Sequence, residues 1–282
     1  MSNQAIGVFD SGLGGLTAVR QLQELLPGEN IVYFGDTARV PYGTKGRDVI
    51  LSYAQQDIAF LLTKNVKFVL AACGTVSSTY PKEAGRALPV GYMGVVEPTC
   101  RAAAQTSRTG RIGVIATEAS ISSGIYQSTL SALLPNAVVT AKACPLFVPL
   151  VESGHFSPTD RMAALAAEEY LAPLKEDGID TLILGCTHYP LLAPVISAQM
   201  GPAVTLVDSG KEAALALREK LAAAHLLNPA QTGGSTHYYV SDAPDRFRRL
   251  AGIFLGEHVS EHVGHVSIET FAAPAAATDE KR

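Results

Sequence analysis

The feature that most constrains the fold is a short apolar segment, 181–184, that ends abruptly in the sequence Gly-Cys-Thr-His. Pro190 follows at a position suited to the first turn of a helix. A run of β-branched and leucine residues bounded by glycine predicts a buried strand of an α/β sheet. Cys186 is therefore expected at the carboxyl end of a strand, where open α/β sheets place their ligands.

The same design occurs earlier in the chain, where the apolar segment 67–72 is followed directly by Cys73. The two halves also match at their beginnings, because Ile-Gly-Val occurs at 6–8 and again at 112–114. Each half thus has an early strand that leads to a hydroxyl residue and a later strand that leads to a cysteine. The repetition predicts two similar halves that face each other and bring Cys73 and Cys186 to a shared cleft.

Strands and helices alternate along the whole chain, which predicts an α/β fold. We expect two pseudo-symmetric, doubly wound domains with mainly parallel sheets and an active site in the cleft between them. The first domain is expected to comprise residues 1–97 and 207–270, and the second 98–206. The tail at 272–282 is rich in proline, alanine and charged residues, and we expect it to be disordered.

Individual elements follow from apolar periodicity and from turn residues. Strands are expected at 5–9, 31–34, 66–71, 89–96, 112–116, 137–140, 181–184, 204–207, 238–240 and 265–268. Helices are expected at 14–26, 44–63, from about 76, at 98–107, 159–175, after Pro190, at 210–226 and at 243–254. The segment 144–152 contains two prolines within an apolar run, so we expect an irregular segment packed against the core.

The composition excludes several classes of protein. The chain has 282 residues, enough for two domains with proper cores, and 47% hydrophobic against 17% charged residues argues against disorder. A net charge of −4 without a basic cluster argues against a nucleic-acid partner. No apolar run is long enough to span a membrane, and the N-terminus lacks a signal pattern. A cytoplasmic enzyme acting on a small molecule is the expectation.

Four cysteines occur, at positions 73, 100, 144 and 186, and their wide spacing does not suit a metal site or a disulfide framework. Cys100 and Cys144 are expected to be buried as small apolar residues. Cys73 and Cys186 differ because each follows a strand and is surrounded by small polar residues. No metal and no cofactor are expected.

The turn at 10–16 is rich in glycine and leads into a predicted helix. It is similar to a phosphate-binding loop, but Thr17 leaves the dinucleotide pattern Gly-x-Gly-x-x-Gly incomplete. We expect its free N–H groups at the helix start to hold a carboxylate instead.

Two cysteines on opposite sides of one cleft suit the inversion of a carbon centre. A single base returns a proton to the face it came from, whereas two opposed bases remove one proton and deliver another to the opposite face. One sulfur must then begin as thiolate and the other as thiol. A free thiol has a pKa of about 8.5, which a helix N-terminus or a neighbouring imidazolium lowers. Both cysteines precede predicted helices, His188 lies two residues from Cys186, and Asp10 is placed to accept or orient a proton.

Taken together, six motifs resemble those of the glutamate racemase family, over about residues 5 to 270. They are Asp10-Ser-Gly-Leu-Gly-Gly15, Pro41-Tyr-Gly43, Ala72-Cys-x-Thr75, Cys144-Pro-Leu-Phe-Val-Pro-Leu-Val-Glu152, Gly185-Cys-Thr-His-Tyr-Pro-Leu-Leu192 and Val207-Asp-Ser-Gly210. The resemblance implies cofactor-independent interconversion of L- and D-glutamate, supplying D-glutamate for peptidoglycan. It implies a small-molecule partner, and a homodimer is an open expectation.

Carried over by position, the resemblance also implies roles for single residues. Cys73 would act on D-glutamate and Cys186 on L-glutamate, and proton transfer would be assisted by Asp10, Glu152 and His188. The residues implied in substrate binding are Asp10, Ser11, Tyr42, Gly43, Gly74, Thr75, Thr117, Thr187 and His188. Hydroxyl and backbone N–H groups of this kind can hold two carboxylates without a basic patch.

One position departs from the family. The family usually has Cys-Asn-Thr where this chain has Cys-Gly-Thr, so the amide that would contact the substrate is absent at Gly74. An unmade hydrogen bond to a charged group costs about 1.5–3 kcal/mol. We expect activity to persist, because both thiols, Asp10 and His188 remain, and we expect Gly74→Asn to change turnover or affinity.

Simpler interpretations remain open for several of these residues. His188 could be an ordinary strand-end histidine, Glu152 a solvated loop acid and Asp10 only a helix cap. Asp208 is expected to cap the start of the helix that follows it, at 210–226. Thr117 could either contact the ligand or cap a helix.

Other functions also remain open at this point. A relative that racemises aspartate or another acidic amino acid would differ in pocket size, which the sequence does not give. A non-catalytic glutamate-binding regulatory protein would bind the ligand without exchanging its Cα proton. A pyridoxal enzyme is disfavoured because no lysine occurs in the motifs.

Overall fold

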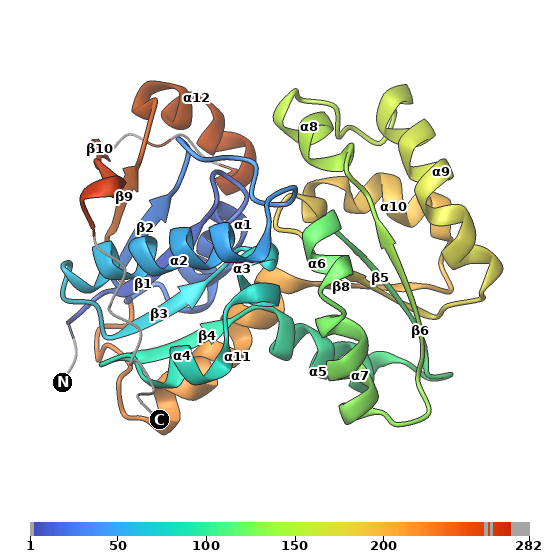
Figure 1. Ribbon diagram of the computed structural model, residues 1–282, viewed down its shortest axis with the longest axis horizontal. Coiled ribbons are helices and arrows are strands. Elements are labelled where there is room, and N and C mark those ends of the chain that lie inside the picture. The colour runs from blue at the N-terminus through green and yellow to red at the C-terminus, as the bar shows by residue number, and fades with distance from the viewer. Residues whose placement is uncertain (1–2, 257–258, 260–261, 272–282) are drawn as a thin grey trace, which may run out of the picture.

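The computed structural model describes residues 3–256, 259 and 262–271. Two parallel sheets lie side by side, each with helices packed on it, so the molecule has two α/β domains (Figure 1). The disorder expected for the tail at 272–282 concerns residues outside the described ones. No helix in the described part of the chain has both the length and the apolar character that crossing a membrane requires.

The first domain contains a six-stranded sheet, in which every pair of neighbouring strands is parallel. Its strands, in spatial order, are β10 (Val263–His265), β9 (Thr236–Val240), β2 (Ile31–Gly35), β1 (Ile6–Asp10), β3 (Phe68–Ala71) and β4 (Gly91–Gly94). The first four strands of the chain therefore have the order 2-1-3-4, typical of a doubly wound fold with its switch point between β1 and β3.

The second domain repeats this order in a four-stranded parallel sheet. Its strands, in spatial order, are β6 (Val138–Ala143), β5 (Arg111–Ala116), β7 (Thr181–Leu184) and β8 (Thr205–Asp208). The equivalence of β1 with β5 and of β3 with β7 confirms the predicted pseudo-symmetry. The residue boundaries given above for the two domains stay a prediction.

The helices connect these strands in chain order. In the first domain they are α1 (Leu16–Leu25), α2 (Arg47–Leu62), α3 (Gly74–Thr79), α4 (Lys82–Arg86) and α12 (Pro244–Leu255). The remaining helices are α5 (Val96–Thr106), α6 (Glu118–Ser122), α7 (Ile125–Leu133), α8 (Phe147–Glu152), α9 (Arg161–Glu176), α10 (Ala193–Met200) and α11 (Ser209–Ala223). Two 3₁₀ helices, η1 and η2, cover Tyr189–Leu192 and Ile268–Thr270.

The sheet of the first domain is buried on both faces, and its strand sequences show why. Because side chains alternate across a strand, Ile6 and Val8 of β1 point into one core while Phe9 points into another. The first core includes Leu16 and Leu22 of α1, and the second includes Ile58 of α2. Apolar residues on both faces thus require helices on both sides, which is the doubly wound arrangement.

The sequence-based elements differ from the structure in a few places. The segment expected to be irregular, 144–152, ends in the helix α8, because Pro149 lies in the first turn, where proline is tolerated. The short helices α4, α6 and α7 were not expected. The strand expected at 265–268 lies earlier, at Val263–His265, and its end is followed by the 3₁₀ helix η2.

Candidate active site

The two cysteines singled out by the sequence occupy equivalent positions. Cys73 is the second residue after the end of β3, and Cys186 is the second residue after the end of β7. Cys73 is 4% exposed and Cys186 7% exposed. Because β3 and β7 are equivalent strands, the pseudo-symmetry places one buried thiol at the switch point of each sheet.

Asp10 and Ser11 accompany Cys73 on the first domain. Asp10 is the last residue of β1, is buried, and accepts a hydrogen bond from the Gly12 N–H at 2.9 Å. The Cys73 thiol donates to Ser11 Oγ at 3.7 Å. Burial raises the pKa of the Asp10 carboxyl, which outweighs the opposite effect of His188 and of the Gly12 N–H.

The Cys73 thiol does not have the lowered pKa that its place before a helix suggested. Cys73 is the N-cap of α3, but burial and then the charge of Asp10 raise the pKa of its thiol to about 12. The expectation was wrong for this residue because desolvation of a thiolate exceeds what the N–H groups of a six-residue helix return. Cys73 therefore rests as a neutral thiol.

His188 accompanies Cys186 on the second domain. Its Nδ1 lies 3.9 Å from Cys186 Sγ, and its Nε2 lies 3.1 Å from Glu152 Oε1 at the end of α8. Phe254 of α12 packs edge-on against the imidazole, with ring centroids 5.3 Å apart. Contacts on three sides thus fix the ring, and the role of His188 in proton transfer stays a prediction.

Electrostatics make His188 a cation at neutral pH. Burial alone would lower its pKa, but the hydrogen bonds to Cys186 and Glu152, with the nearby charges, raise the pKa of His188 to about 10. The hydrogen bond from His188 in turn lowers the pKa of Glu152, which is therefore not a solvated loop acid. The imidazolium and the carboxylate form an ion pair beside Cys186.

Contacts between the domains connect the two sides. Thr187 Oγ1 lies 3.5 Å from Asp10 Oδ1, and the Thr17 hydroxyl of α1 donates to the Thr187 carbonyl at 3.1 Å. Sequence reasoning identified Thr187 through the resemblance but missed Thr17, which only the folded chain brings to this loop.

Thr75 and Thr117 meet across the domains. Their hydroxyl oxygens are 3.0 Å apart, and Thr117 Oγ1 also accepts from the Ser120 N–H at 3.4 Å. Thr117 is therefore a helix cap of α6 and, at the same time, faces the first domain. The capping interpretation of Thr117 is confirmed, and its contact with a ligand stays a prediction.

The loop after β2 brings Tyr42 and Gly43 to the same region. The Tyr42 side chain is buried, and its hydroxyl donates to Asp36 and Asp57. Its hydroxyl is therefore used within the first domain, a point that the motif alone did not reveal. The Gly43 carbonyl accepts from the Ala119 N–H at 3.0 Å, which joins this loop to the second domain.

Gly74 lies against the backbone of the second domain. An ideal Cβ built on Gly74 would be 2.3 Å from the Gly185 carbonyl oxygen, which also accepts from the Tyr126 hydroxyl at 3.3 Å. An asparagine here would have to displace that backbone. The change Gly74→Asn would therefore add the family's amide and disturb the backbone of the second domain at the same time. A change in turnover or affinity in this variant could not be ascribed to the amide alone.

Asp208, Cys100 and Cys144 have the structural roles that the sequence predicted. Asp208 is the N-cap of α11 and accepts from the N–H groups of Gly210 and Lys211, which confirms its expected capping role. Cys100 and Cys144 are fully buried, as expected. Among the residues that the structure describes, no cluster of three or more histidine, cysteine or acidic side chains could hold a metal ion.

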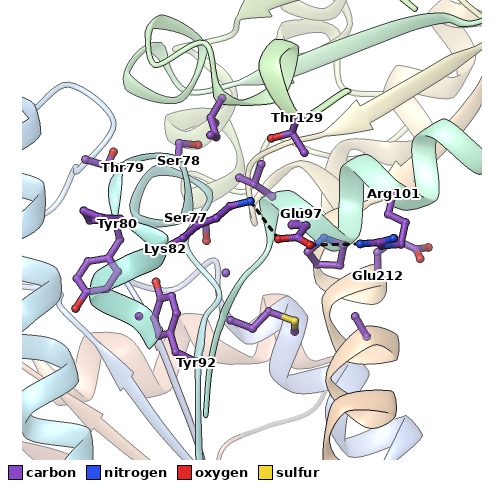
Figure 2. Close-up of a pocket in the computed structure, with 18 of the residues that line it drawn as sticks. Ser77, Ser78, Thr79, Tyr80, Lys82, Tyr92, Glu97, Arg101, Thr129 and Glu212 are labelled. Atoms are coloured by element: carbon purple, nitrogen blue, oxygen red, sulfur yellow. Dashed lines mark hydrogen bonds and ion pairs between the residues drawn. The ribbon is translucent and has the colours of Figure 1, made fainter. Parts of the chain in front are cut away.

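A large hollow of about 1600 Å³ lies away from the cysteines, between α3, α4, α5 and α11. Figure 2 shows two ion pairs in it, from Glu97 to Lys82 and from Glu97 to Arg101, both at 3.3 Å and both solvent-exposed. The described residues that line it include neither a cysteine nor a histidine. The buried thiols of Cys73 and Cys186 therefore lie outside the lining of this hollow.

Comparisons with known proteins agree with this geometry. Residues 7–217 match the family model described as Asp/Glu/Hydantoin racemase. The glutamate racemase of Geobacter metallireducens is 44% identical over 266 residues, which are 94% of this chain and 97% of that protein. The crystal structure of Thermus thermophilus glutamate racemase in complex with β-chloro-D-alanine has 43% identity and a TM-score of 0.85, covering 95% of this chain and 99% of that one. The Francisella tularensis glutamate racemase in complex with D-glutamate has 36% identity and a TM-score of 0.88, covering 96% and 100%.

Proposed function

We propose a mechanism and a biological role for this chain on the premise that it belongs to the glutamate racemase family and is an amino-acid racemase. The proposal is that it interconverts L- and D-glutamate without a cofactor, with one cysteine acting on each face of Cα. The observation that carries it is the placement of Cys73 and Cys186 at equivalent switch points of the two sheets.

The proposed reaction conserves protons. The thiolate of Cys186 takes the Cα proton of L-glutamate as the Cα–H bond breaks, and the thiol of Cys73 gives its proton to the opposite face as the new Cα–H bond forms. Cys186 is then a thiol and Cys73 a thiolate, so D-glutamate is converted by the reverse steps. No oxidant, reductant or other reactant is needed.

The surroundings of the two sulfurs support this assignment. The imidazolium of His188, held by Glu152, lies beside Cys186 and stabilises negative charge there. Asp10 lies near Cys73 and raises the pKa of its thiol. The raised pKa of Cys73 keeps this sulfur protonated, as the proposed donor to the face opposite the proton of L-glutamate must be.

Substrate binding is proposed for residues around the two thiols. The hydroxyl groups of Ser11, Thr75 and Thr117 and the loops that carry Gly43 and Thr187 lie within the same hydrogen-bonded region. The bound D-glutamate of the Francisella tularensis protein supports a glutamate substrate here. For Tyr42 and Gly74 the proposal involves the backbone, since the Tyr42 hydroxyl bonds to Asp36 and Asp57.

The proposed biological role is the supply of D-glutamate for peptidoglycan, and the proposed location is the cytoplasm. Four free cysteines, all buried, suit a reducing compartment. A homodimer stays a prediction.

Proton NMR of L- and of D-glutamate in D₂O, with purified protein and no added cofactor, tests the proposal. We expect the Cα–H signal of both enantiomers to disappear and the optical rotation to decay to zero. Exchange of the Cα proton of aspartate but not of glutamate would show that the substrate is aspartate. Binding of glutamate without exchange would overturn the enzyme mechanism and indicate a binding protein.

A further inference from the structure

The first domain presents glycines at several of its contacts with the second domain near the thiols. An ideal Cβ on Gly74 would lie 2.3 Å from the Gly185 carbonyl oxygen, and one on Gly43 would lie 2.8 Å from Thr117 Cβ and 3.0 Å from its Cγ2. Real Cβ atoms essentially never come within 3.0 Å of a heavy atom. A side chain at Gly74 or Gly43 would therefore have to push the domains apart.

A third glycine behaves in the same way. A Cβ on Gly14 would lie 2.2 Å from Thr187 Oγ1 and 2.5 Å from His188 Nδ1. None of the three glycines has a positive φ, so the backbone does not demand glycine here. The requirement at these positions is the absence of side-chain volume between two domains.

Hydrogen bonds across the same contacts depend on that closeness. The Ala119 N–H donates to the Gly43 carbonyl at 3.0 Å, and the hydroxyl oxygens of Thr75 and Thr117 are 3.0 Å apart. Hydrogen bonds of these two kinds keep donor–acceptor distances of about 2.5–3.2 Å. The distance between the domains is therefore set closely at these points, and Gly74 and Gly43 are what permits it.

We propose that Gly74, together with Gly43, sets the separation of Cys73 and Cys186 across the reacting carbon. This proposal rests on the proposed two-thiol mechanism and adds a positioning role that no contact with substrate requires. Gly74 directly follows Cys73, and the carbonyl it touches directly precedes Cys186. Any atom inserted between them moves one sulfur relative to the other.

The replacement Gly74→Ala tests this proposal, with Gly46→Ala as the matched control. Gly46 also has a negative φ, and a Cβ there would meet nothing within 4 Å. We expect Gly74→Ala to lower kcat roughly 10- to 100-fold, since a displacement of about 1 Å costs up to 100-fold. The isotope effect on kcat with 2-deuterated glutamate should rise, because proton transfer becomes slower than the other steps. Gly46→Ala should leave both values unchanged.

Gly43→Ala is a second variant. The group that faces its new methyl is the side chain of Thr117, which can itself be shortened. We expect a smaller loss than for Gly74→Ala, because a side chain, not a backbone carbonyl, faces the new methyl group. The change Thr117→Ser removes the Cγ2 contact and keeps the hydroxyl. Serine keeps the Cβ contact at 2.8 Å, so the double variant should recover part of the rate lost in Gly43→Ala, which mere destabilisation of the fold does not predict.

Wild-type exchange is measured first in the same assay, so that the two proposals fail separately. No exchange by the wild type would overturn the proposed function, and the spacing role with it. Wild-type exchange together with a folded Gly74→Ala that has unchanged kcat and isotope effect would overturn the spacing role alone. If Gly74→Ala does not fold, absence of rescue in the Gly43→Ala, Thr117→Ser pair would overturn it.

Discussion

The two thiol sites have the same backbone frame and opposite electrostatic surroundings. Cys73 and Cys186 follow equivalent strands by the same number of residues. Yet Cys73 has a carboxyl group, Asp10, and a hydroxyl group near it, and its thiol has a pKa of about 12. Cys186 has the imidazole of His188, whose own pKa is about 10, and behind it Glu152.

In the proposed mechanism, this difference lets a duplicated fold serve two faces of one carbon. The common frame would supply the geometry, with one sulfur from each domain. The different neighbours would supply the order of proton transfer, because a cation favours a thiolate and an anion favours a thiol. A symmetric pair of sites would leave the resting protonation undefined.

The largest effect is expected from removing either sulfur. Cys73→Ala and Cys186→Ala should each lower racemisation roughly 10²- to 10⁴-fold, the range typical of a general acid or base. In Cys73→Ala, which retains Cys186, we expect exchange of the Cα proton in D₂O only from L-glutamate, without inversion. In Cys186→Ala, which retains Cys73, we expect exchange only from D-glutamate. Proton NMR together with optical rotation separates these outcomes.

Cys100→Ala is the matched control, since Cys100 is fully buried and lies in the core of the second domain. It should retain the wild-type rate per folded molecule. Full racemisation by either Cys73→Ala or Cys186→Ala would show that the two sites do not divide the faces of Cα between them.

An intermediate effect is expected from Glu152→Gln, which changes only the Cys186 side. Loss of the carboxylate should lower the pKa of His188 from about 10, so the fall in kcat/KM at alkaline pH should begin at lower pH. A pH–rate profile of both proteins checks this. Glu97→Gln is the control, because Glu97 forms only solvent-exposed ion pairs, and its profile should match the wild type.

The ion pair between His188 and Glu152 should also make the stability of the fold depend on pH. The pKa of His188 is raised on folding, so its contribution is complete below 6.5, its unfolded value, and is lost as the pH rises through about 10. The pKa of Glu152 is lowered, so its contribution is present above 4.5 and is lost at lower pH. The melting temperature of Glu152→Gln should therefore fall below that of the wild type most between pH 4.5 and 6.5. An equal difference at pH 11 would contradict the assignment.

The smallest effect is expected from Ser11→Ala, which changes only the Cys73 side. It removes the acceptor that lies 3.7 Å from the thiol, worth about 0.5–1.5 kcal/mol, or a two- to tenfold lower kcat. Because the two enantiomers have equal free energies, kcat/KM must stay equal in both directions. Circular dichroism assays in each direction should therefore show the change in kcat and KM separately, and an unchanged kcat in both directions would exclude a role for this contact.

Much of the frame could be predicted because its signals are local. The apolar runs before Cys73 and Cys186, and the repeated Ile-Gly-Val, each lie within a few residues, and they give the strands, the pseudo-symmetry and the position of both thiols. The cap at Asp208 was equally predictable, since it depends on the next three residues only.

What could not be predicted depends on residues distant in the sequence. The raised pKa of Cys73 comes from its burial in the folded protein, which opposes the local effect of the helix start. The contacts of Phe254 with His188 and of Gly185 with Gly74 join segments that no motif connects. The sequence therefore locates the two thiols, whereas the pKa of Cys73 and the close contact beside Gly74 follow from the tertiary structure.

The most direct test of the unequal thiols is a pH titration of thiolate ultraviolet absorbance in Cys73→Ser and Cys186→Ser. Background from Cys100 and Cys144 is the same in both variants, and burial raises the pKa of each of these thiols. The account predicts that the variant retaining Cys73 gains no thiolate signal from this residue at the pH where a free thiol ionises, about 8.5, because burial and Asp10 raise the pKa of Cys73 to about 12. A thiolate signal from Cys73 at that pH would contradict it.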